Sequence, residues 1–206
     1  MSALRSALQA AATRLSQQVL DEMYENPWWM QRYGERGRHF ADEDSLHHIS
    51  YLDAALAAND PAVFEKYARW LRSVLVSRGM CSAHLGENFQ RLSQAIRSTG
   101  LPDSRAAHEI LERGWSSLRY VDGPAALLQA EEDPLLAAIR DALPRGVDVR
   151  EDDLMYLVSY LIDGVATGEM AHFELFAARF PTGVVDALRK TASPHLPDAP
   201  VRSHRA

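Results

Sequence analysis

The chain of 206 residues has a single cysteine, Cys81, so no disulfide can form within it. A lone cysteine is typical of reducing compartments, and we predict a cytoplasmic protein. Basic residues are not in excess either: 22 Lys and Arg stand against 28 Asp and Glu, and the formal net charge is −6. Because nucleic-acid binders normally present a basic face, we expect no nucleic-acid partner.

Long apolar runs are also missing. No run approaches the roughly 20 residues that a membrane-spanning helix needs. The richest run, residues 154–166, is interrupted by Ser159, Asp163 and Gly164. The first residues lack the apolar core of a signal peptide. We therefore expect no membrane association.

Alternating strand patterns are absent, and good helix formers (Ala, Leu, Arg, Glu, Gln) dominate. Apolar residues make up 47 % and charged residues 24 %, which is the ordinary globular range. The sequence predicts an all-α fold, a single multi-helix globular domain over residues 1–192. Residues 193–206 begin with three prolines in eight positions and are expected to form a mobile tail. The leading helix, within residues 1–26, could serve as a docking or dimerisation element or close over its own core.

Helix boundaries follow from proline and glycine. The residue before a proline is pushed out of the helical region, so Asn26-Pro27 ends the first helix. Asp60-Pro61 begins the third helix, Gly79 ends it, and Ser82 can cap the fourth. The predicted ranges are 3–25 for the first helix, 37–58 for the second, 83–98 for the fourth and 150–167 for a central helix that is apolar on most sides.

Acids and histidines gather on the second predicted helix. His39, Glu43 and His47 follow one another at i, i+4 and are expected to lean toward water. Asp44 and His48 form a parallel pair at the edge of the buried face. A carboxylate and an imidazole one turn apart can share a metal ion or hold one tautomer of the imidazole.

A second carboxylate–imidazole pair is Glu169 and His172, in a helix predicted over residues 168–179. Di-iron carboxylate bundles use such Glu-x-x-His pairs. One hypothesis is therefore an iron centre held by Asp44, His48, Glu169 and His172. The alternative is a glutamate favoured by the helix dipole and a histidine with one backbone partner.

Aromatic residues allow two interpretations as well. Trp28 and Trp29 lie in a connector that also holds Tyr33, and they could plug one end of the core. They could instead wall a flat-ligand pocket, with His47 and His48 as further cofactor-binding residues. The spacing of Phe64, Tyr67 and Trp70 indicates a core stripe.

Part of the chain resembles the phycobiliprotein branch of the globin-like fold. That family shows an aspartate, a Tyr-containing helix, a tight turn, a Leu-Arg pair and a closing glycine. The corresponding features here are Asp44, Tyr51, the turn Ala57-Ala58-Asn59-Asp60-Pro61, Leu71-Arg72 and Gly79. The likeness covers about a quarter of the chain, residues 41–98, and implies a globin-like helical fold. The family's bilin-attaching cysteine is replaced by Ala41, so only a non-covalent tetrapyrrole could bind here.

Three hypotheses follow for the function. The first is a sensory or regulatory helical domain, a possible homodimer, that binds a small ligand or a partner protein. The second is a non-haem di-metal oxidoreductase that uses the acid–histidine pairs. The third is a haem- or bilin-binding protein that uses His47, His48 or His172. No catalytic motif in the sequence names a reaction.

Overall fold

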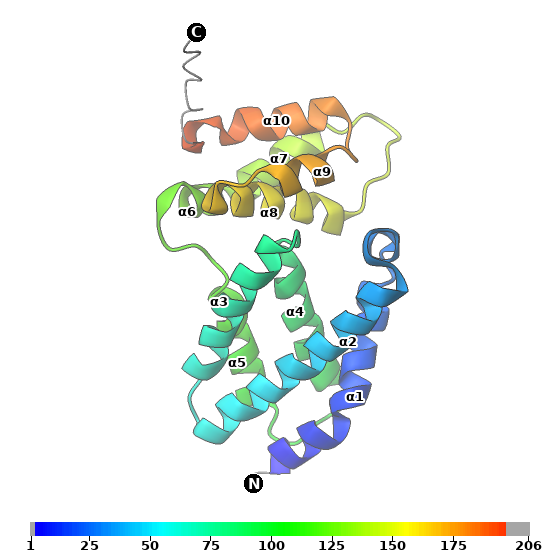
Figure 1. Cartoon of the computed structure of the whole chain (residues 1–206), viewed down its shortest axis with the longest axis vertical. Coiled ribbons are helices and arrows are strands. Elements are labelled where there is room, and N and C mark those ends of the chain that lie inside the picture. Colours follow the sequence, from blue (N-terminus) through cyan, green and yellow to red (C-terminus); the bar gives the residue numbers. More distant parts are fainter. Residues whose placement is uncertain (1–2, 197–206) are drawn as a thin grey trace. The chain divides into compact units, whose positions relative to one another are not determined.

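A computed structural model describes residues 3–196 and contains ten α-helices and one short 3₁₀ helix (Figure 1). No strand occurs within this range, so the predicted all-α fold class is confirmed. None of its helices is long and apolar enough to cross a membrane. Most of the predicted tail, residues 197–206, lies outside the described range. The elements are α1 (Ala3–Met23), α2 (Pro27–Ala58), α3 (Ala62–Ser77), α4 (Ser82–Ser98), α5 (Arg105–Ser116), α6 (Gly123–Ala130), α7 (Glu132–Asp141), α8 (Glu151–Thr167), α9 (Ala171–Ala177), α10 (Thr182–Ala192) and η1 (Ser193–His195).

The contacts between residues divide the chain into two compact units. Unit 1 comprises Met1–Leu75 and His84–Leu118, and unit 2 comprises Val76–Ala83 and Arg119–Ala206. Each unit has its own apolar core, and the two are described in turn.

In unit 1, α1 and α2 run side by side in opposite directions (Figure 1). The apolar stripe of α1 is buried, with Leu8 and Leu15 fully inaccessible and Val19 and Leu20 at 1 % exposure. Burying such a stripe is what stabilises an amphipathic helix. The stripe that could have served for docking or dimerisation therefore closes over the unit's own core.

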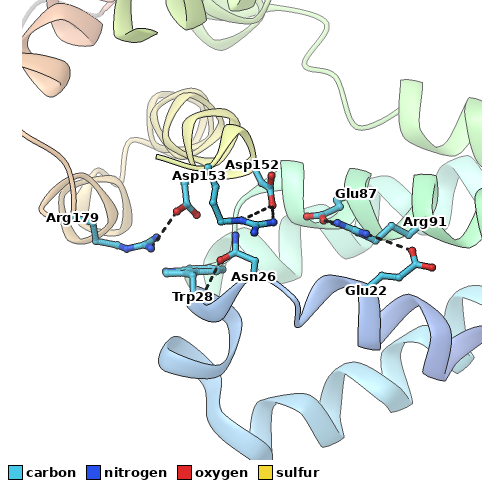
Figure 2. Close-up of polar contacts among 9 residues, drawn as sticks. Glu22, Asn26, Trp28, Glu87, Arg91, Asp152, Asp153 and Arg179 are labelled. Atoms are coloured by element: carbon cyan, nitrogen blue, oxygen red, sulfur yellow. Dashed lines mark hydrogen bonds and ion pairs between the residues drawn. The ribbon is translucent and has the colours of Figure 1, made fainter. Parts of the chain in front are cut away.

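The segment from Trp28 to Tyr33, predicted as a connector, is helical instead. Proline suits the first position of a helix, so Asn26-Pro27 ends α1 and also begins α2. The Asn26 side chain accepts a hydrogen bond of 3.0 Å from the backbone N–H of Trp28, as Figure 2 shows. Gly34 then breaks the helical geometry at φ 60° and ψ −166°, and α2 continues after this kink.

Arg91 of α4 links α1 to α4. Its guanidinium lies 2.6 Å from Glu87, one turn before it, and 3.4 Å from Glu22 of α1 (Figure 2). These groups are partly exposed, so each pair stabilises the fold only modestly. The pair with Glu22 joins the two helices.

The contact between α3 and α5 depends on a glycine. A Cβ atom at Gly114 would lie 2.4 Å from two ring carbons of Phe64, which is fully buried. In a close-packed core, the ring or the helix backbone would have to shift to make room for this atom. A larger residue at this position is therefore destabilising.

We expect Gly114→Ala to lower the free energy of unfolding by about 1–3 kcal/mol, because overpacking strains the Phe64 ring. Urea unfolding followed by circular dichroism measures the change. The matched control is Ser116→Ala, an exposed position of the same helix, which should be neutral. An unchanged stability of Gly114→Ala would mean that the two helices are not in close contact.

In unit 2, α8 is the central helix that the sequence predicts. Every residue from Tyr156 to Gly164 is buried. Asp163 is one of these buried residues, with 2 % exposure. Its carboxylate needs hydrogen-bond donors to offset the loss of its contacts with water. Its carboxylate accepts hydrogen bonds from the Ser82 backbone N–H at 2.6 Å, the Ser82 hydroxyl at 3.0 Å, the Tyr120 hydroxyl at 2.7 Å and the Ser159 hydroxyl at 3.4 Å.

This arrangement changes the role predicted for Ser82. The sequence predicts that Ser82 caps the fourth helix with its own hydroxyl, but Ser82 is the first residue of α4, and its hydroxyl donates to Asp163. The carboxylate of Asp163 takes the place of the cap, since it accepts a backbone N–H that the helix itself leaves unpaired.

We expect Asp163→Ala to destabilise the protein by about 3 kcal/mol or more, because four donors lose a shared, buried acceptor. Tyr120→Phe removes only one of these bonds and should cost about 1 kcal/mol. Both changes are measured by chemical unfolding. Equal effects of the two substitutions would contradict a shared network centred on Asp163.

Candidate functional site

The acid–histidine stripe of α2 faces the solvent as predicted. The side chains of His39 and Glu43 are 70 % and 56 % exposed, and the imidazole Nε2 lies 3.7 Å from the carboxylate. His47 is exposed too. The structure thus separates His47 from His48, which is buried, and the two do not form the joint cofactor site that the sequence suggested.

His48 is the buried polar residue around which the candidate site is built. It is 3 % exposed, and its Nδ1 lies 2.6 Å from the hydroxyl of Tyr67 on α3. Its ring meets Phe89 of α4 edge-on, with 5.3 Å between centroids and 85° between planes. The sequence paired His48 with Asp44, but the hydrogen bond to His48 comes from Tyr67.

Burial fixes the protonation of this pair. Loss of water around the imidazole, with a smaller repulsion from His47, lowers the pKa of His48 to about 3. Burial also raises the pKa of Tyr67, and the charges of Asp44 and Tyr51 raise it further. Both groups are therefore neutral at pH 7. Between two neutral groups the bond has one donor and one acceptor, and the tautomer of the imidazole decides which ring nitrogen carries the proton.

Two further rings extend this pair to the surface. Tyr51 stacks on Tyr67 with 3.9 Å between centroids and 11° between planes, and Trp70 lies 6.2 Å from Tyr67. Tyr51 is 41 % and Trp70 is 59 % exposed, whereas Tyr67 is 5 % exposed. We name Tyr51, Tyr67 and Trp70 the aromatic surface.

The prediction that Trp70 belongs to a core stripe is wrong. At about 100° per residue, Trp70 points about 120° away from Phe64 around the helix, while Leu71 returns to within about 20°. Phe64, Tyr67 and Leu71 are accordingly buried, and Trp70 faces outward.

Trp28 and Trp29 fill the interior of unit 1. They are 5 % and 2 % exposed and meet in a T-shaped contact of 5.2 Å. His84 packs against both, at 4.9 Å and 4.7 Å between centroids, and burial lowers the pKa of His84 to about 3. This close packing supports the interpretation that Trp28 and Trp29 fill one end of the core, rather than the interpretation that they line a ligand pocket.

Glu169 and His172 do not share a helical face. Helix α9 begins only at Ala171, because Gly168 ends α8 in the left-handed region and two irregular residues follow. Glu169 is exposed. The half-buried His172 packs on Gly79, where a Cβ would lie 3.0 Å from its Nδ1. The predicted helix over 168–179 is therefore too long at both ends.

The predicted metal centre finds no support in this geometry. Asp44 and His48 belong to unit 1, whereas Glu169 and His172 belong to unit 2. Among residues 3–196, no three or more His, Cys, Asp or Glu side chains are grouped so that they could hold a metal ion.

Comparison with protein-family models, with curated proteins and with solved structures gives no match to this chain. The resemblance to the phycobiliprotein branch of the globin-like fold remains a prediction, since none of these comparisons tests it. The case for a function therefore depends on the site itself.

The two buried histidines make an acid-sensitive unit 1. His48 and His84 bind protons near pH 6.5 when unfolded but only near pH 3 when folded, so stability is full above pH 6.5 and is lost as the pH falls toward 3. We expect each histidine to cost about 1.4 kcal/mol per pH unit below 6.5. Urea unfolding at pH 7.5 and 5 measures this loss.

The control variants separate these histidines from other titrating groups. His48→Asn keeps an acceptor for Tyr67 but does not titrate, so it should reduce the pH dependence. His39→Asn replaces an exposed imidazole and is the matched control for the substitution itself. The interpretation is wrong if His48→Asn shows the same loss of stability between pH 7.5 and 5 as the natural sequence.

Proposed function

We propose that unit 1 is a regulatory docking module that binds a partner protein through the aromatic surface. The observation that carries this proposal is the 59 % exposure of Trp70 beside a tyrosine stack. Isolated exposed apolar side chains are common, but a joined group of large rings is not. Tryptophan and tyrosine are also the residues that most often dominate the affinity of protein interfaces.

The rigidity of the aromatic surface supports the same function. Tyr67 is held by its hydrogen bond to His48, and Tyr51 lies flat against Tyr67. Rings that are already fixed lose little conformational entropy when a partner binds. The buried hydrogen bond therefore acts on binding indirectly, since it orients the inner ring on which the exposed ring rests.

A tetrapyrrole held by His48 is less compatible with these contacts. Tyr67 occupies Nδ1 of His48, so an iron atom would have to reach Nε2 of a side chain that is only 3 % exposed. The rings of Trp28 and Trp29 are packed on each other and on His84. We therefore favour a partner protein over a flat cofactor as the ligand of unit 1.

Selection from a phage library of random peptides, with the full chain immobilised, tests the proposal. Recovered peptides are then measured against Trp70→Ala by fluorescence anisotropy. We expect affinity to fall about 30-fold, which corresponds to the 2 kcal/mol typical of a tryptophan hot spot. Circular dichroism establishes that the variant is folded.

The matched control is Phe40→Ala, which removes another exposed ring from unit 1, 49 % accessible and outside the aromatic surface. Peptides should bind this variant as they bind the natural sequence. The proposal fails if no recovered peptide depends on Trp70, or if Phe40→Ala weakens binding as much as Trp70→Ala does.

A further inference from the structure

We infer that the partner binds through an acidic segment, whose carboxylates meet Lys66 and Arg69 while its apolar side chains cover Trp70. This inference rests on the proposed function, because it names the chemistry of the partner for the same surface. It follows from the distribution of charge around the aromatic surface, which differs from that of the whole chain.

The outward side of α3 carries positive charge. Lys66, Arg69 and Trp70 are all exposed there, and Ser73 continues the same side one turn further. The acidic residue of α3, Glu65, contributes little to this outward side, because its side chain is only 18 % exposed. It lies 2.7 Å from Arg113 of α5 and 3.8 Å from Arg69, so Arg113 takes the closer contact.

The neighbouring side of α2 adds no free carboxylate. Its exposed positions are His47, Ser50, Tyr51, Ala54, Ala57 and Ala58. Asp53 is the one acid in this stretch, and Arg5 of α1 binds both of its oxygens, at 2.7 Å and 2.9 Å. That contact lowers the pKa of Asp53, so the carboxylate stays ionised and paired. Asp44, one turn before His47, is half-buried, and its charge acts on Tyr67, so the positive charge of the surface lies on the side of Lys66 and Arg69.

The result is an aromatic face with positive charge on its α3 side, on a chain of net charge −6. Acidic segments are attracted to such a face, whereas basic ones are repelled. Exposed ion pairs contribute only about 0.2–1 kcal/mol each, so charge selects the partner and Trp70 supplies most of the affinity. Lys66 and Trp70 are one helical turn apart, so a matching segment places a carboxylate and an apolar side chain at a similar spacing.

The peptide selection on the full chain also tests this inference when the recovered sequences are read. We expect peptides that depend on Trp70 to be enriched in Asp and Glu over Lys and Arg.

The double variant Lys66→Glu, Arg69→Glu should lower the affinity for these peptides about tenfold at low salt, and less at high salt. A second selection on that variant should return basic peptides. The control is Arg105→Glu, an exposed charge on α5, which should change nothing.

The outcomes separate the two proposals. Trp70-dependent peptides without acidic enrichment overturn this inference and leave the docking function intact. An absence of Trp70-dependent peptides overturns both. A second copy of the chain is another candidate for binding this surface, and sedimentation of the protein alone tests for it. Self-association that Trp70→Ala abolishes would show that the surface binds a second copy, and it would also overturn the inference.

Discussion

The hydrogen bond between His48 and Tyr67 is the constraint on which the candidate site depends. Both groups are buried, and each would be costly there without the other. The bond therefore fixes the position of the Tyr67 ring. Tyr51 and Trp70 take their places from that ring, so a buried polar contact shapes an exposed apolar one.

In unit 2, too, a buried polar group is stabilised by hydrogen bonds. Asp163 is a buried carboxylate, and it accepts hydrogen bonds from a helix terminus and from three hydroxyl groups. Ser82 and Ser159 are buried and Tyr120 is half-buried, and together they stabilise the unit. In unit 1, by contrast, a fixed polar pair supports rings that remain accessible.

Helix positions were largely predictable, because their signals are local. Proline, glycine and apolar periodicity located α1, α3, α4 and α8 within a few residues of the observed bounds. Errors arose where one signal has two meanings. Asn26-Pro27 ends one helix but equally begins the next, so the segment from Trp28 to Tyr33 was misassigned. Trp70 was placed inside because a spacing of six residues was treated as one helical face.

The sequence by itself determined the all-α fold and the central position of α8. It also determined that His39, Glu43 and His47 of α2 face the solvent while His48 lies toward the buried face. These features depend on periodicity and on local backbone preference, which are properties of short segments. Only the tertiary structure decided that Tyr67 rather than Asp44 is the partner of His48, and that Asp163 caps α4. Such pairings join residues from different helices, and spacing along the chain carries no information about which helix faces which.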